Sequence, residues 1–176
     1  MSEAIELHAA DPGWPAAFEA EHALILLCGC ADPAGTYGST AIPGLPAKPI
    51  IDIIALVADL EAARAAIPAL EALGYSYWAA NPDTTKLYLA KGLPPAPRRT
   101  HHLHIHDDAD EVTRHLMFRD HLRANPDVRD AYLSLKQDLA SRYRHDREAY
   151  SKLKTDFIDA LVLSLGGPAR KVDWNR

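Results

Sequence analysis

The segment IIDIIALV, residues 50–57, constrains the fold more than any other part of this sequence. Its residues are mostly β-branched and do not alternate between apolar and polar, which is typical of a central strand covered on both faces. The chain therefore needs a sheet with other elements packed on both sides. One ionisable residue, Asp52, interrupts the segment. Because an ionised carboxylate is costly in a core unless it is paired or bound, Asp52 is expected at a strand end or in a site.

Turn and capping residues divide the rest of the chain into helices and further strands. A helix over about 12–28 is predicted to follow the cap at Asp11. Asp59 caps a second helix, which Pro68 kinks or divides before it ends at Gly74. Further strands are predicted near 36–38 and over 75–79, 85–91 and 100–106, and further helices over 110–122, 128–143 and 150–165. This order predicts an α+β fold, a mixed β-sheet with an N-terminal helix and a C-terminal helical layer.

The composition is that of a soluble protein with one core. With 176 residues, 48% hydrophobic and 24% charged, the chain is expected to form one domain over 1–176. Its core is predicted over about 8–165, with a short mobile tail over 167–176. No apolar stretch approaches the ~20 residues of a membrane span, and the acidic N-terminus does not resemble an export signal. We therefore expect a cytoplasmic protein without membrane contact.

The charge and the cysteine content exclude two further classes of protein, those that bind nucleic acid non-specifically and those with a structural zinc site. The net charge of −5 argues against non-specific binding to nucleic acid, which requires many cations against the phosphates. Cys28 and Cys30 lack the second pair of ligands that a structural zinc site needs. They are expected to be ordinary reduced thiols.

Gly38, Ser39 and Thr40 form a turn between a predicted short strand and the strand that carries Asp52. The turn offers backbone N–H groups and hydroxyls that suit a phosphate, although Gly–Ser is also common in ordinary turns. Asp52 has two interpretations. It binds nearby N–H groups or an arginine for structural reasons, or it takes part in catalysis or ligand binding.

Three histidines share one face of the strand over 100–106. Strand alternation places His102, His104 and His106 on that face, and His101 on the core side in a structural position. Neutral imidazoles are common ligands of transition metals, and an aspartate on an adjacent strand would complete a three-ligand site. The alternative is a row of histidines that bind neighbouring polar groups or a phosphate.

Cations in the second half of the chain are candidate anion ligands. Arg98 and Arg99 directly precede the histidine strand, and the guanidinium fork matches a phosphate or carboxylate with two bonds. Most cations on the predicted C-terminal helices are expected to be solvated and paired with acidic residues one turn away. The candidates among them for an anion site are Arg119, Arg123 and Lys154.

An ordered series of motifs in this chain resembles the GrpB family. The series comprises DPGWP at 11–15, GSTAIPGL at 38–45, KPIIDI at 48–53, RTHHLH at 99–104, FRDHLR at 118–123, LK at 135–136, and DREAY at 146–150 with Lys154 and Phe157. The resemblance covers about residues 8–165. It implies a nucleotidyltransferase-superfamily fold of the DNA polymerase β type, in a family whose activity is largely unassigned. Some members are fused to dephospho-CoA kinase, but this chain has no Walker-type GK[ST] sequence.

The chain departs from the superfamily pattern at a position that matters for metal binding. Active members follow the Gly–Ser turn with an Asp-x-Asp or Asp-x-Glu pair for two metal ions, whereas Ile54 stands at the second position here. His102 and His104 fall about where a later strand of the superfamily brings a third acid. The resemblance therefore implies a site of Asp52, His102 and His104, which favours a softer divalent metal than Mg²⁺.

The leading functional hypothesis is an enzyme of nucleotidyl- or phosphoryl-transferase ancestry that acts on a small anionic molecule, with a nucleoside triphosphate as a candidate. In this hypothesis the turn that contains Ser39 holds a phosphate that Lys48 and Arg99 neutralise. The Asp/His cluster binds a metal or acts as a general base. The alternatives are a non-nucleotide acid–base or metal-assisted enzyme of a specialised pathway, and a catalytically silent module that binds an anion or nucleotide.

Overall fold

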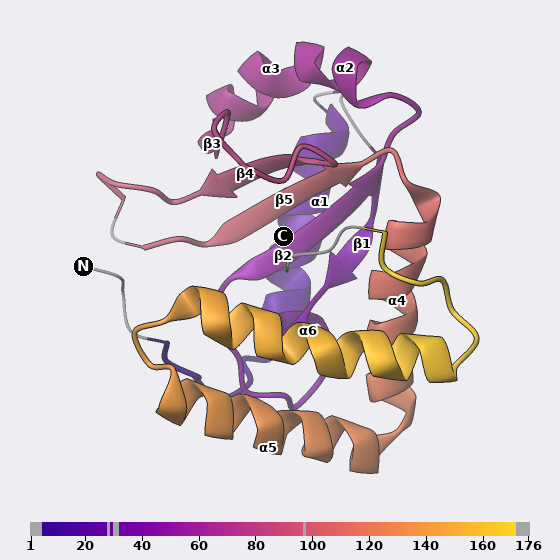
Figure 1. Ribbon diagram of the computed structural model, residues 1–176. Coiled ribbons are helices and arrows are strands. Elements are labelled where there is room, and N and C mark those ends of the chain that lie inside the picture. Colours follow the sequence, from indigo (N-terminus) through magenta and orange to yellow (C-terminus); the bar gives the residue numbers. More distant parts are fainter. Residues whose placement is uncertain (1–4, 28, 30–31, 97, 172–176) are drawn as a thin grey trace.

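The centre of the molecule is a five-stranded mixed sheet with the strand order β1-β2-β5-β4-β3 (Figure 1). A computed structural model describes residues 5–27, 29, 32–96 and 98–171. The strands are β1 (Asp32–Tyr37), β2 (Ile51–Leu56), β3 (Tyr75–Tyr77), β4 (Leu87–Lys91) and β5 (His101–His106). The segment over 50–57, which does not alternate between apolar and polar residues, contains β2. This strand pairs antiparallel with β1 and parallel with β5. β4 lies antiparallel to both β5 and β3.

The helices follow the predicted order. They are α1 (Trp14–Leu27), α2 (Leu60–Ala63), α3 (Ile67–Ala72), α4 (Ala109–Ala124), α5 (Pro126–Arg142) and α6 (Arg147–Ser164), with the 3-10 turns η1 (Ser39–Ala41) and η2 (Arg64–Ala66). Asp59 caps α2 by accepting from two backbone N–H groups, as predicted. Pro68 lies in the first turn of α3, so the second predicted helix is divided into short pieces rather than kinked.

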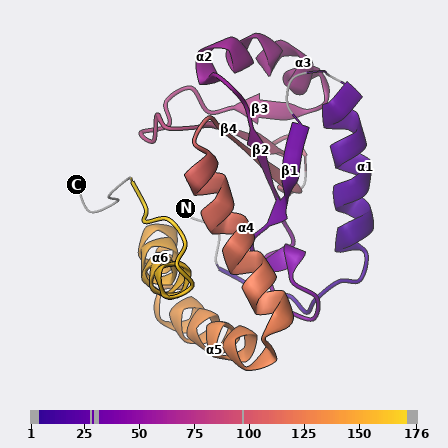
Figure 2. The ribbon, with the colours of Figure 1, turned by 90° about the vertical axis from the view of Figure 1, so that its right-hand side faces the viewer.

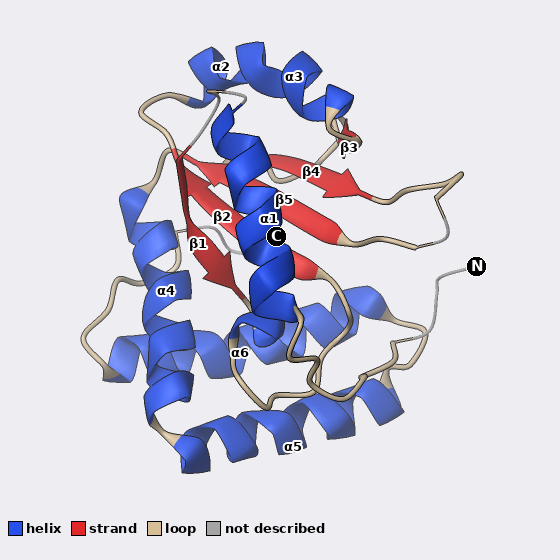
Figure 3. Cartoon of the chain, turned by 180° about the vertical axis from the view of Figure 1, so that it is seen from behind, coloured by secondary structure: helices blue, strands red, loops and turns tan. Residues whose placement is uncertain are grey.

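The two faces of the sheet are covered by different helices. Figure 2 shows α1 on one side of the sheet and α6 on the other. Figure 3, which views the molecule from behind, shows α1 crossing in front of the sheet. The core beneath α1 joins Trp14, Phe18 and Ile25 to Ile51 and Ile53 of β2. A second core lies among the loop after β1, α4, α5 and α6. Strand alternation then directs Asp52 away from α1, toward the face on which α6 lies.

The first residues of the predicted tail are bound to α4 and α6. Arg114, which is fully buried on α4, donates to the carbonyl of Pro168 and pairs with Asp159 of α6. Arg170 donates to the same Asp159 carboxylate, and Lys171 pairs with Asp108 just before α4. The glycine pattern that predicted a mobile tail from 167 onward did not reveal these contacts of Pro168, Arg170 and Lys171.

The remaining sequence expectations concern residues that the structure does not describe and the absence of a membrane span. Cys28, Cys30 and residues 172–176 lie outside the described ranges. Among the residues that are described, no helix combines the length and apolar character needed to cross a bilayer.

Candidate functional site

Asp52 and His102 meet because β2 and β5 are parallel neighbours in register. The two residues are register partners, and the imidazole Nδ1 of His102 lies 3.0 Å from Oδ1 of Asp52. A carboxylate only accepts, so the imidazole donates this hydrogen bond. The side chain of Asp52 is 29% exposed and that of His102 is 14% exposed. The carboxylate predicted to need a partner therefore has one, at the surface of the sheet.

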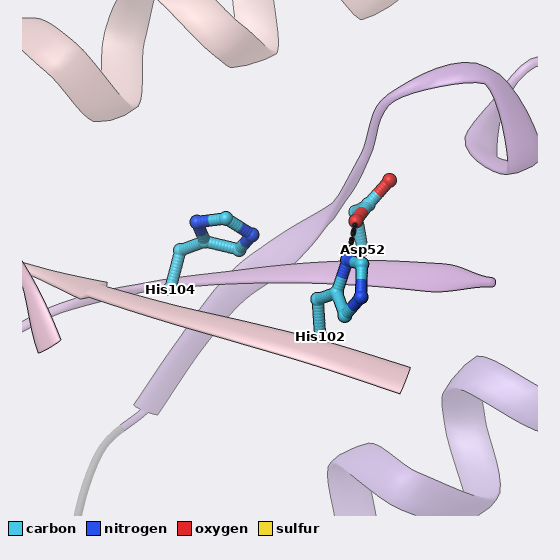
Figure 4. A group of neighbouring side chains, drawn as sticks. All are labelled: Asp52, His102 and His104. Carbon is cyan, nitrogen blue, oxygen red and sulfur yellow. Dashed lines mark hydrogen bonds and ion pairs between the residues drawn. The ribbon is translucent and has the colours of Figure 1, made fainter. Parts of the chain in front are cut away.

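His104 completes a three-residue cluster on the same face of the sheet. Asp52, His102 and His104 each offer one ligand atom, and these atoms all lie within 4.8 Å of one another (Figure 4). Burial, assisted by the charges of Lys86 and His102, holds the pKa of His104 well below its usual value. Its imidazole is therefore neutral near pH 7, which is the form that binds a metal. The Nε2 atom of His102 is buried and has no hydrogen-bond partner among the described residues.

Gly38 lies directly against the carboxylate of Asp52. Its φ of 72° and ψ of −168° belong to a region that is essentially restricted to glycine. A Cβ atom at this position would stand 2.8 Å from Oδ2 of Asp52, which is closer than real contacts allow. The glycine predicted from the turn is thus required for the close approach between the turn and the cluster.

Lysines from three segments gather beside this turn. Lys136 of α5 is fully buried, and its Nζ donates to Oγ of Ser39 at 2.9 Å and to the carbonyl of Pro46. Burial, with the charges of Lys154 and Lys48, lowers the pKa of Lys136 to about 7. Burial and Lys48 lower the pKa of Lys154 to about 8, while Asp52 opposes that shift. The three lysines are therefore close enough to repel one another, next to the acidic end of the cluster.

The other predicted anion ligands have separate locations. Arg99 lines a cavity of about 540 Å³ together with His104, whereas Arg98 is exposed. Arg119 donates to the carbonyl of Thr36 at 2.9 Å, and Arg123 donates to that of Ala41 at 2.9 Å.

Those last two arginines line a different cavity, beside α1. The structure thus uses Arg119 and Arg123 to hold the backbone around the turn and does not bring them to the Asp/His cluster. Thr40 likewise donates its hydroxyl to the carbonyl of Ile50, at 3.2 Å. Of the three turn residues, Gly38 contacts Asp52 and Ser39 contacts Lys136.

The two remaining histidines of β5 lie apart from the cluster. His101 contacts Thr100 through Nδ1 at 3.1 Å and lies near Ala17 of α1, on the core side as predicted. His106 is 3% exposed, and burial lowers its pKa to about 4. Its ring lies 6.4 Å from that of His115 on α4.

A cavity of about 940 Å³ lies between α6, the start of α4 and the sheet. Tyr37 of β1 connects this cavity with the cluster, because its ring centroid is 5.4 Å from that of His104 and 4.5 Å from that of His115. Burial, with the charge of Asp52, raises the pKa of Tyr37 well above its usual value, so its hydroxyl stays protonated.

Sequence reasoning did not select Tyr37, Lys136, Tyr88 or Trp78 as site residues. Two of them carried a usable signal. Tyr37 directly precedes the Gly–Ser turn, and Lys136 belongs to the short LK motif of the family resemblance. Tyr88, by contrast, was assigned only to a strand, and the sequence left Trp78 open between a position in the core, in a pocket wall and in an interface.

Comparison with known proteins places the chain among relatives of one family. The model of the family described as "GrpB protein" matches residues 4–163. A UPF0157 protein of Pseudomonas aeruginosa is 42% identical over 161 residues, which are 90% of this chain and 66% of that protein. This chain therefore spans just under two thirds of the length of that relative.

A solved structure and an enzyme are also similar to the chain. The crystal structure of the conserved protein GrpB from Enterococcus faecalis is 32% identical, with a TM-score of 0.78, over 90% of this chain and 96% of that one. This likeness confirms the predicted α+β fold. A protein of Mycolicibacterium paratuberculosis named dephospho-CoA kinase is 34% identical over 140 residues, which cover 66% of this chain and 34% of that protein.

Proposed function

The chain belongs to the GrpB family, and we propose that it is an enzyme that acts on a phosphate group of a small molecule with a divalent metal held by Asp52, His102 and His104. The observation that carries the proposal is the convergence of one carboxylate and two imidazoles within 4.8 Å on adjacent strands. This donor set suits zinc or manganese better than magnesium. A metal at this position would supply Lewis-acid chemistry at a phosphoryl oxygen.

The residues around the cluster are arranged to receive an anion. Lys154 is close enough to both Lys48 and Asp52 for their charges to act on its pKa, and a phosphate bound beside the two lysines would relieve their mutual repulsion. Lys136 holds Ser39 in place through the hydrogen bond from its Nζ to Oγ of Ser39. The substrate class supported best is therefore a phosphorylated small molecule or a nucleotide, with nucleotidyl or phosphoryl transfer as the reaction class.

The similarity to a dephospho-CoA kinase adds only modest support to phosphoryl transfer. That name describes a protein of which the match covers 34%. This chain contains no GK[ST] phosphate-binding sequence. The proposal therefore depends on the cluster and the lysines, and does not include coenzyme A precursors as substrates.

A second candidate function uses the same residues without a metal. The 3.0 Å hydrogen bond between Asp52 and His102 orients the imidazole, as in a carboxylate–histidine base. Such a base suits acid–base chemistry on a substrate that is not a nucleotide. A silent anion-binding module is the third candidate, because Ile54 supplies no second carboxylate.

Isothermal titration with zinc and with manganese separates these candidates. The native protein is expected to bind one ion, and both Asp52→Asn and the double variant His102→Ala/His104→Ala are expected to lose that binding. His106→Gln, on the same strand face but outside the cluster, serves as the control and is expected to bind normally. Because imidazole must be neutral to bind a metal, affinity is expected to fall as the pH is lowered, with the part due to His104 lost only well below the usual histidine pKa of about 6.5. Equal metal affinity in all variants would overturn the proposal.

A second set of titrations tests the substrate class. Inorganic phosphate and the four nucleoside triphosphates are titrated into the metal-loaded protein, and turnover of each nucleotide is followed by ³¹P NMR. The double variant Lys48→Met/Lys154→Met is expected to lose phosphate affinity and to keep zinc affinity. Catalysis without any bound metal would favour the carboxylate–histidine base, whereas ligand binding without turnover would favour the silent module.

A further inference from the structure

A row of aromatic rings continues from the Asp/His cluster toward the far edge of the sheet. Tyr88 of β4 is the register partner of His104. Its ring centroid lies 5.0 Å from that of His104 and 5.3 Å from that of His102. Trp78 follows β3 and donates its backbone N–H to the carbonyl of Tyr88 at 3.0 Å. Its ring lies edge-on to Tyr88, at 6.0 Å. The row therefore connects the cluster to Trp78 in two ring contacts.

Trp78 is 49% exposed, although it stands at the end of this row of ring contacts. It lines the cavity of about 540 Å³ together with Tyr88, His104 and Arg99. It also lines the cavity of about 940 Å³ beside α6. Both volumes fall in the range that holds small organic ligands. A large aromatic side chain that is half exposed between two such cavities leaves much of its surface available to a bound molecule.

We propose that Trp78 is the stacking platform for a planar ring in the substrate, so that the substrate combines an aromatic or heteroaromatic ring with a phosphate. This inference rests on the proposed function, which places the phosphate near Lys154 and the reacting end at Asp52. A molecule with both groups crosses the strands from β2 over β5 and β4, with Tyr88 along its path. Arg99 lines the same cavity as the ring and offers a donor to a polar substituent.

The indole suits this role better than a purely structural one. Stacking on an aromatic side chain tolerates different rings, because every planar ring has a π-face. A structural tryptophan would be covered by the core, as Trp14 is, with 8% exposed. Because half of Trp78 is already in contact with solvent, its replacement by leucine is expected to leave the folded protein and the metal cluster unchanged.

Calorimetric titration of Trp78→Leu and Trp78→Phe tests the proposal. The probes are AMP, UMP and phenyl phosphate, which carry a purine, a pyrimidine and a benzene ring, and ribose 5-phosphate, which carries no planar ring. Trp78→Leu is expected to bind at least one ring probe about tenfold more weakly than the native protein does. Trp78→Phe is expected to retain most of that affinity, and ribose 5-phosphate is expected to bind equally to all three proteins.

Two outcomes would overturn the proposal. One is that none of the three ring probes binds the native protein, and the other is that Trp78→Leu binds all of them with native affinity. Zinc titration of the same variant keeps this test separate from the proposed function. If Trp78→Leu loses its preference for ring probes but still binds zinc, the result bears on the role of Trp78 alone. If Asp52→Asn binds zinc as the native protein does, the result bears on the proposed metal site. Thermal unfolding of Trp78→Leu is the check that the variant is folded.

Discussion

Replacement of Gly38 by alanine tests whether the turn and the Asp/His cluster depend on each other. The new Cβ would stand 2.8 Å from Oδ2 of Asp52, so we expect the carboxylate to shift and to weaken its 3.0 Å hydrogen bond with His102. The backbone conformation, with φ at 72° and ψ at −168°, adds a strain of about 1–3 kcal/mol for any residue but glycine. We expect that loss in the free energy of unfolding, measured with urea. Displacement of one charged ligand is worth a further 1.5–3 kcal/mol or so, so zinc affinity is expected to fall by roughly 10- to 100-fold.

Gly44→Ala is the matched control for this experiment. Gly44 also has a positive φ, of 76°, but a Cβ added there meets no atom within 4 Å. Gly44→Ala is expected to lose only the free energy of unfolding that backbone strain costs, about 1–2 kcal/mol, and to bind zinc normally. If Gly38→Ala binds zinc as tightly as Gly44→Ala does, the carboxylate is not held by its contact with the turn. Gly38 and the metal site are then independent of each other.

Three further predictions concern charge. Burial raises the pKa of Glu111, but bonds and charges from His115, Arg114 and Arg170 outweigh it and lower the pKa to about 2. Its contribution, roughly 3 kcal/mol, is present above about pH 4.5 and lost as the pH falls toward 2. Urea unfolding should therefore show native protein and Glu111→Gln converging in stability over that interval. Lys136 has its pKa lowered to about 7, so the unfolded chain binds more protons than the folded one between about pH 7 and 10.5. Stability should rise with pH there, and the part of this rise due to Lys136 should vanish in Lys136→Met. Arg99→Lys should weaken AMP binding by roughly 1–3 kcal/mol in calorimetry, because a two-bond fork becomes a point charge; equal affinity would place Arg99 outside the site.

The sequence predicted the parts of the fold that depend on local pattern. The missing alternation around Asp52 identified a covered strand, and period-two spacing placed His102 and His104 on one face, as observed. The strand order was not predictable, because it depends on long-range packing. The contact between Asp52 and His102 nevertheless depends on that order, because the parallel pairing of β2 with β5 makes the two residues register partners.

The contacts made by the ends of long side chains were the least predictable feature of the structure. Arg119 and Arg123 were expected to contact an anion, but their guanidinium groups donate to the backbone carbonyls of Thr36 in β1 and of Ala41 in η1. Both side chains carry several donors, and backbone carbonyls at a strand end and in a turn require partners. Lys136 was overlooked for the complementary reason. A lysine on a predicted helix is usually solvated, whereas this one is buried by the packing of α5 against the loop.

In the proposed site, His104 lies beside the position that would carry a second carboxylate in an Asp-x-Asp pair. Ile54 is fully buried and is the register partner of His104. The imidazole therefore stands beside the position where an Asp-x-Asp pair would carry its second acid. One carboxylate with two neutral imidazoles gives the proposed site a single negative charge, so a bound divalent ion keeps a net positive charge. That charge, with Lys48 and Lys154 nearby, attracts an anionic group. In the proposed site, Ile54 supplies no ligand for a second magnesium ion, and the remaining donors would suit a single softer ion and a phosphate.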